Sequence, residues 1–160
     1  MASSLKNLSE YVKNKDIDIS NKRFAIVVSD YYTDITESLF NGVVETLLKE
    51  GAKEENIFKE YAPGTYELTL ASQYMAQLDE VDAVICLGCV IQGETKHFDF
   101  ICHAVAQGLT NVSLKYDKPV IFGVLTPNTM QQALDRAGGK HGNKGVEAAM
   151  AAVKMLGFNQ

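Results

Sequence analysis

Hydrophobic residues in this 160-residue chain fall into two alternating kinds of segment. Three short runs, Phe24–Val28, Val81–Ile91 and Pro119–Leu125, are rich in valine and isoleucine and lack polar alternation; Ile57–Tyr61 is a weaker fourth run. Continuous apolar runs of this length are typical of parallel strands that are covered on both faces. We therefore predict four such strands.

Longer segments between these runs repeat apolar residues at the spacing of one helix face. The repeats are Ile35-Leu39-Val43-Leu47, Leu68-Ser72-Met75-Leu78 and Phe98-Ile101-Val105-Leu109. Two further helices are predicted at about Asn128–Ala137 and Lys144–Leu156, separated by the glycine-rich segment Gly138–Gly142. The chain is thus expected to alternate strands with helices.

Local motifs predict where some helices begin and end. Asp34 and Glu37 have the spacing of a capping box, and Gly51 predicts the end of the same helix. Thr126 followed by Pro127 predicts an N-cap with proline at the first helical position.

Repeated strand–helix units connect parallel strands through right-handed crossovers. We therefore predict an α/β fold: a three-layer sandwich with a central parallel four-stranded sheet and helices on both faces. Residues 1–22 are polar and lie outside this pattern, so we expect an N-terminal arm that could add an edge strand. Residues 23–160 are then a single domain.

Composition and charge narrow the class of protein. The formal net charge of −5 comes from interspersed acids and bases without a basic cluster, which argues against a nucleic-acid partner. No apolar run approaches the roughly 20 residues that cross a bilayer, and Met1–Asn21 lacks the apolar centre of a signal peptide. We expect a soluble cytoplasmic protein with no membrane partner.

The three cysteines do not predict a disulfide framework or a metal site. Cys86 and Cys89 lie in one predicted strand at a spacing that directs them to opposite faces, so we expect core thiols. His97, Asp99 and His103 also lack a metal-ligand spacing. We therefore expect no metal.

Candidate chemistry lies where the predicted strands end, because ligands of parallel sheets bind beyond the carboxyl ends of the strands. Gly93, Glu94 and Thr95 precede a predicted helix start, where backbone N–H groups can bind phosphate. His97 follows and can transfer protons near neutral pH. A solvated surface histidine is an equally good interpretation of His97 alone.

Other strand-end residues are compatible with binding a flat, hydroxyl-rich molecule. Tyr31 and Tyr66 could stack on a heterocycle, and Glu67 could accept hydrogen bonds from a polyol. Arg136 and Lys144 flank a glycine-rich loop and could bind phosphate. Taken singly, each of these side chains also fits a structural role at the surface.

Four longer motifs carry a resemblance to a known family. They are Pro63–Glu67 (PGTYE), Leu87–Phe100 (LGCVIQGETKHFDF), Pro119–Thr126 (PVIFGVLT) and Arg136–Gly145 (RAGGKHGNKG). In order and spacing, the chain from Phe24 onward resembles lumazine synthases, which implies a flavodoxin-like form of the predicted sheet. The implied reaction condenses 5-amino-6-(D-ribitylamino)uracil with 3,4-dihydroxy-2-butanone 4-phosphate to 6,7-dimethyl-8-ribityllumazine, phosphate and water, without a cofactor.

The same resemblance implies a role for individual residues. His97 is implied as the proton-transfer residue. The residues implied to bind the pyrimidine and its ribityl chain are Tyr31, Thr65, Tyr66, Glu67, Cys89, Val90 and Ile91. Glu94 and Thr95 would form the phosphate loop, with Arg136 as the anchor of the phosphate. Phe122, expected from a neighbouring subunit, and Lys144 would complete the site.

Some positions depart from the family pattern. Gln92 and Glu94 stand where an arginine and a small residue are common, and Asp30-Tyr31-Tyr32 replaces the usual Arg-Phe-Asn. These departures weaken no catalytic assignment directly. One alternative is a paralogue that binds a lumazine or flavin without making it, although the presence of His97, Arg136 and Lys144 together argues against it. A flavodoxin-like signalling domain is a second alternative, although it should carry a cluster of acids where this chain has only Asp30.

Family members form pentamers, and twelve pentamers form an icosahedral shell in some of them. The resemblance thus implies a homopentamer, leaves a 60-mer open and suggests riboflavin synthase as a further partner.

Overall fold

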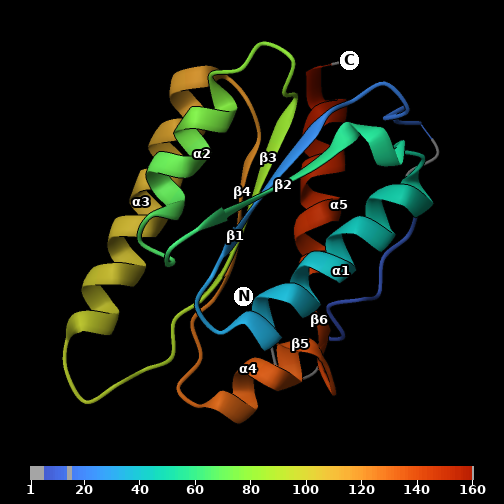
Figure 1. Ribbon diagram of the computed structural model, residues 1–160. Helices are drawn as coiled ribbons and strands as arrows, with labels where there is room; N and C mark the ends of the chain where they lie inside the picture. The colour runs from blue at the N-terminus through green and yellow to red at the C-terminus, as the bar shows by residue number, and fades with distance from the viewer. Residues whose placement is uncertain (1–5, 14–15, 160) are drawn as a thin grey trace.

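The computed structural model describes residues 6–13 and 16–159 (Figure 1). Within them, a four-stranded parallel sheet has the strand order β2-β1-β3-β4. Its strands are β1 (Phe24–Ser29), β2 (Ile57–Ala62), β3 (Ala83–Cys89) and β4 (Val120–Leu125). All four predicted strands are therefore confirmed.

Helices cover both faces of the sheet, as predicted (Figure 1). Helices α1 (Thr33–Glu50) and α5 (Lys144–Leu156) lie on one face, and α2 (Leu68–Ala76) and α3 (His97–Tyr116) lie on the other. The glycine-rich segment between α4 (Met130–Arg136) and α5 forms a hairpin of β5 (Ala137–Gly139) and β6 (Gly142–Asn143). Short 3₁₀ helices cover Glu54–Asn56 and Gly157–Asn159.

Burial on both faces explains why the strands do not alternate apolar and polar residues. Ile85 and Leu87 of β3 pack with α1 and α5, whereas Val84 packs with α2 and α3. Cys86 and Cys89 are free thiols that belong to these two different cores, so the prediction of opposite faces is confirmed. Burial raises the pKa of both thiols to about 12, which keeps them neutral.

Two of the predicted helix ends are wrong, because contacts distant in sequence replace the local ones. Helix α1 follows Tyr32 in a left-handed conformation without a side-chain cap, while Glu37 binds a lysine of β2. Residues 126–127 stay outside the helix, since the Pro127 carbonyl accepts a hydrogen bond from the Gln92 N–H at 2.9 Å. Thr129 is the N-cap of α4, whereas Gly51, at φ 106°, ends α1 as predicted.

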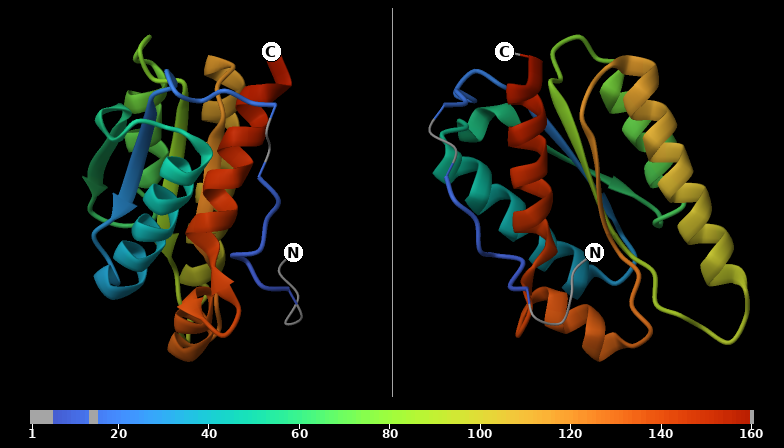
Figure 2. Two further views of the ribbon diagram at one scale, coloured as in Figure 1. Left: turned by 90° about the vertical axis from the view of Figure 1, so that its right-hand side faces the viewer. Right: turned by 180° about the vertical axis from the view of Figure 1, so that it is seen from behind.

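The described part of the N-terminal arm runs outside the layer of α1 and α5 to the β5–β6 hairpin (Figure 2). The possible edge strand is absent from residues 6–13 and 16–22, because this stretch packs against the helices and the hairpin instead of beside the sheet. None of the helices in the described ranges is long and apolar enough to cross a membrane.

Candidate functional site

A cleft of about 560 Å³ lies beyond the carboxyl ends of β1, β2 and β3. This is the edge of the sheet where a ligand was expected. The predicted site residues that line this cleft are Tyr31, Thr65, Tyr66, Glu67, Cys89, Val90, Ile91 and His97. Three segments of the chain thus bring the predicted pyrimidine-binding residues together with the predicted proton-transfer residue.

Close packing of Thr65 on β3 fixes one wall of the cleft. Thr65 is buried, and its hydroxyl donates a hydrogen bond of 3.4 Å to the Cys89 carbonyl. A Cβ atom on Gly88 would lie only 2.8 Å from the Thr65 Oγ1, so glycine is needed at this approach. The loop that also carries Tyr66 and Glu67 is thereby held against the end of β3.

Exposed aromatic rings form the rim of the cleft. Tyr31 is 61% exposed and Tyr66 is 56% exposed, so both rings are available for stacking. Tyr32 lies edge-on to Tyr31, with ring centroids 4.8 Å apart. Burial raises the pKa of Tyr32, and the nearby Tyr31 and Cys89 add smaller effects in the same direction. The hydroxyl of Tyr32 therefore stays protonated at neutral pH.

Tyr32, Gly64 and Ile101 line the cleft but were not among the predicted site residues. Two of them carried a usable sequence signal. Tyr32 follows Tyr31 in the same strand-end segment, and Ile101 lies four residues after His97, on the same face of α3.

The predicted phosphate loop is open to solvent. Glu94 and Thr95 are exposed and line neither this cleft nor the second cavity described below. Apart from Gly93 and its two chain neighbours, no heavy atom of the described residues lies within 4 Å of a Cβ built on Gly93, so the space beside this residue is free for a ligand. His97 is the first residue of α3 and is also exposed. The loop thus precedes a helix start directly, as the sequence predicted.

The remaining predicted residues gather in a second cavity of about 570 Å³ beside the edge strand β4. Phe122, Arg136 and Lys144 line it together with Leu8 of the N-terminal arm. The Arg136 Nη1 donates to the Gln132 carbonyl at 3.1 Å, and the Lys144 Nζ lies 2.7 Å from the Glu147 Oε1. Within one chain, these cations therefore line a different cavity from His97.

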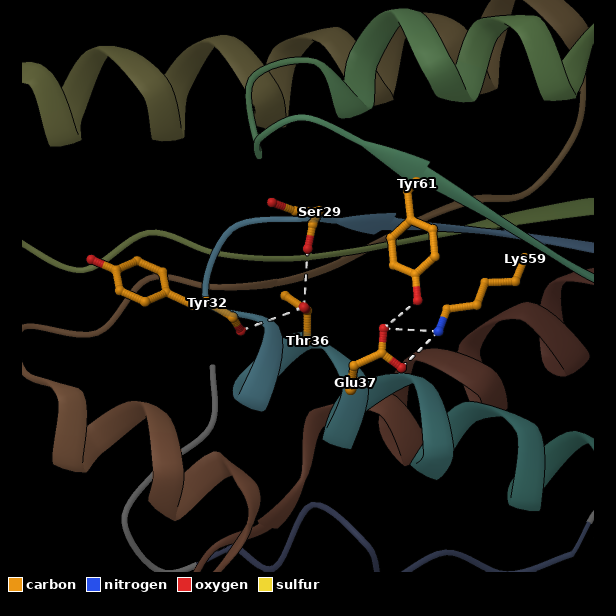
Figure 3. Close-up of polar contacts among 6 residues, drawn as sticks. All are labelled: Ser29, Tyr32, Thr36, Glu37, Lys59 and Tyr61. Carbon is orange, nitrogen blue, oxygen red and sulfur yellow. Dashed lines mark hydrogen bonds and ion pairs between the residues drawn. The ribbon is translucent and has the colours of Figure 1, made fainter.

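A charged network joins α1 to β2 (Figure 3). The Lys59 Nζ lies 2.8 and 2.6 Å from the two Glu37 carboxylate oxygens, and the Tyr61 hydroxyl donates to Glu37 Oε1 at 2.7 Å. The ammonium group also lies 4.0 Å from the centre of the Phe40 ring. Because α1 follows residues 30–32 and β2 precedes residues 63–67, this network links two of the three segments that line the cleft.

The network changes the acid–base behaviour of both partners. Partial burial raises the pKa of Glu37, but the hydrogen bonds from Lys59 and Tyr61 outweigh this effect and leave the pKa below its ordinary value. Burial lowers the pKa of Lys59, but the interactions with Glu37 and Tyr61 reverse this, so its pKa is raised. Both directions indicate an ion pair at neutral pH.

Cleft residues offer general acid–base and hydrogen-bonding groups rather than metal ligands or a nucleophilic thiol. The Cys89 thiol is neutral, as its raised pKa requires, and so acts as an apolar wall. In the ranges that the structure describes, no three His, Cys, Asp or Glu side chains are grouped closely enough to hold a metal ion.

The fold and the cleft define an α/β protein of the flavodoxin-like class with a cleft at the carboxyl ends of its strands, where parallel sheets bind their ligands. Residues 21–160 match the family model described as 6,7-dimethyl-8-ribityllumazine synthase. The chain belongs to this family, so the resemblance seen in the four motifs is confirmed.

Proteins named 6,7-dimethyl-8-ribityllumazine synthase are similar to this chain over nearly its whole length. The protein of Cytophaga hutchinsonii is 58% identical, over 98% of this chain and 98% of its own. That of Parabacteroides distasonis is 50% identical over 99% of both chains. That of Flavobacterium johnsoniae is 51% identical over 100% of this chain and 84% of its own.

Replacing Glu37 by glutamine should lower the melting temperature at pH 7, because the neutral side chain loses its ion pair. The free energy of unfolding should fall by about 0.5–1 kcal/mol, a small amount because the ion pair is partly exposed. The folded-state pKa lies below the ordinary value of 4.5, so this stabilisation is present at neutral pH and is lost as the pH falls through the folded-state pKa. Thermal unfolding at several pH values measures both effects.

Glu45→Gln is the matched control, because Glu45 is an exposed acid on the same helix. An equal, pH-independent decrease in the melting temperature of both variants would contradict a specific role of the Glu37 ion pair.

Proposed function

We propose that this chain catalyses the condensation of 5-amino-6-(D-ribitylamino)uracil with 3,4-dihydroxy-2-butanone 4-phosphate to 6,7-dimethyl-8-ribityllumazine, phosphate and water. The family match over residues 21–160 supports the proposal, and the observation that carries it is that all seven residues implied for the pyrimidine line one cleft with His97. The activity therefore belongs to riboflavin biosynthesis.

The first cleft is proposed to bind the pyrimidine. Exposed Tyr31 and Tyr66 offer flat apolar surfaces for the heterocycle, and such stacking contributes about 0.5–1.5 kcal/mol beyond area burial. The exposed Glu67 carboxylate can accept hydrogen bonds from the hydroxyl groups of the ribityl chain. Cys89, Val90 and Ile91 supply the wall next to the ring.

The phosphate is proposed to bind between the loop Gly93–Thr95 and the cations Arg136 and Lys144. Backbone N–H groups before α3 can donate to phosphate oxygens, and an arginine can bind them with two parallel hydrogen bonds. The carboxylate of Glu94 must point away from the anion. Arg136 is held by its own helix and Lys144 by Glu147, so both are pre-positioned cations.

The two cavities of a single chain are proposed to form complete sites between subunits. Phe122, Arg136 and Lys144 of one subunit would face the cleft with His97 of the next subunit in a homopentamer. The separation of the two residue sets supports such sharing. The family resemblance also leaves open a 60-subunit shell and an association with riboflavin synthase.

His97 is proposed to transfer protons in a reaction made mostly of proton-transfer steps. The 5-amino group attacks the ketone carbon, and loss of water gives a Schiff base. Elimination then breaks the bond between carbon and phosphate oxygen, and phosphate leaves with the electron pair. The enol that remains tautomerises to a ketone, the ribitylamino nitrogen attacks this second carbonyl, and loss of a second water completes the ring. One imidazole suits both donation and acceptance, and holding two substrates together supplies a further acceleration.

Mixing the purified chain with both substrates should yield the lumazine, which is followed by its absorbance and fluorescence. Condensation faster than the uncatalysed background supports the enzyme. Tight binding of the lumazine product without turnover would instead assign the chain to non-catalytic binding.

His97→Ala should lower kcat by about 100-fold or more, because it removes the group that transfers protons. The KM for the pyrimidine should change little, since the stacking and polyol contacts remain. Steady-state kinetics with either substrate varied gives both values. His103→Ala is the control: this exposed histidine lies on the same helix, and its Nδ1 lies 2.7 Å from the Asp99 carbonyl oxygen. A similar decrease in kcat in both variants would refute the proton-transfer role of His97.

Light scattering of the purified protein should give the mass of a pentamer or of a multiple of it. The family resemblance implies the pentamer, and the placement of His97 and the proposed anion-binding cations in separate cavities of one chain supports a site shared between subunits. A fully active monomer would contradict a shared site.

A further inference from the structure

Three residues of the N-terminal arm, Asn7, Leu8 and Ser9, bind the β5–β6 hairpin; we name this segment the N-terminal clasp. The Leu8 N–H donates to the His141 carbonyl at 2.7 Å, and the Asn143 N–H donates to the Ser9 Oγ at 2.9 Å. Inside the clasp, the Ser9 N–H donates to the Asn7 Oδ1 at 3.0 Å. Residues more than 130 positions apart are thus held together by backbone groups and short side chains.

The hairpin is shaped to receive the clasp. Gly142 has a φ of +80°, and a Cβ atom at this position would lie 2.2 Å from the Asn7 Oδ1 and 2.7 Å from the Ser9 nitrogen. Any larger residue would therefore displace the clasp and be strained as well. The glycine serves this close approach as well as the turn.

The same hairpin connects the two cations of the second cavity. Arg136 is the residue immediately before β5, and Lys144 is the residue immediately after β6. Asn143, which binds Ser9, also accepts a hydrogen bond from the Gly145 N–H at 2.7 Å and donates to the Ser38 carbonyl at 2.9 Å. A shift of the hairpin would consequently move the start of α5 and both cations.

Leu8 also reaches the cavity itself. Its side chain is only 2% exposed and lines the cavity together with Phe122, Arg136 and Lys144. An apolar wall excludes water beside the two cations, and charge-assisted hydrogen bonds are stronger where the local dielectric constant is low.

We propose that the N-terminal clasp positions Arg136 and Lys144 for the phosphate of the four-carbon substrate. Leu8 and Ser9 are positioning residues: they hold the hairpin and close the cavity, while the cations contact the anion. This inference rests on the proposed function, in which the second cavity binds the phosphate. It adds a role in substrate binding for an arm that lies outside the α/β domain.

Leu8→Ala and Ser9→Ala test the clasp in the full-length enzyme. Each should raise the KM for 3,4-dihydroxy-2-butanone 4-phosphate by about three- to tenfold, the effect of losing one or two such contacts. The inhibition constant of inorganic phosphate should rise by a similar factor. The KM for the pyrimidine and the kcat at saturation of both substrates should stay within about twofold of wild type, because the first cleft is untouched.

Leu8→Met should restore phosphate affinity, since it refills the apolar wall. Val12→Ala is the control within the arm, because Val12 is 87% exposed and lines neither cavity. Ser9→Ala removes a single hydroxyl from an exposed residue, so it keeps the test valid even if Leu8→Ala fails to fold.

Arg136→Ala, measured in parallel, separates this inference from the proposed function. If Arg136→Ala weakens binding of the phosphate substrate but Leu8→Ala and Ser9→Ala do not, the proposed role of the clasp is refuted and the proposed function stands. Equal rises in the KM values of both substrates, together with a lower melting temperature, would mean that the clasp only stabilises the fold. That result would refute its proposed role in phosphate binding. If Arg136→Ala leaves phosphate affinity unchanged, the phosphate site and the clasp both fail.

Discussion

Helices cover β1 and β3 on both faces, and every side chain of these two central strands is buried. Polar groups could be placed there only with a large desolvation cost, so these two strands carry almost no polar side chains. The chain leaves the apolar core where the strands end, and it is there that hydroxyls, carboxylates and the imidazole of His97 appear. Burial of the sheet thereby fixes the position of the cleft.

Sequence patterns predict these strands because complete burial leaves an uninterrupted apolar run. The helix repeats were equally informative, since one face of each helix packs on the sheet. Predictions based on short motifs succeeded only where the contact is local, as at Gly51. Glu37 fits a capping box, but Lys59 and Tyr61 together offer it three hydrogen bonds, which a single backbone N–H cannot match.

The residues of the candidate site could be predicted from motifs, but their division between two cavities could not. That division depends on where the segment after β4 packs against the sheet. This packing is a property of the tertiary structure, which no single motif encodes. Leu8 had no sequence signal at all. It belongs to a polar arm, and its burial arises from contacts with a hairpin near the opposite end of the chain.

The proposed phosphate loop has little positive charge of its own, so the cations of the second cavity matter for the proposed binding of phosphate. Residues 92–95 contain one carboxylate and no cationic side chain, and the Gln92 side chain donates to the neighbouring Gly93 carbonyl at 2.8 Å. In the proposed phosphate site, the backbone N–H groups of this loop would act against the negative charge of Glu94, and Arg136 and Lys144 would provide much of the attraction for a dianion. Electrostatic attraction of this kind depends steeply on distance and on the exclusion of water. A chain with these loop residues thus gains more from holding its hairpin in place than a chain with an arginine in the loop would.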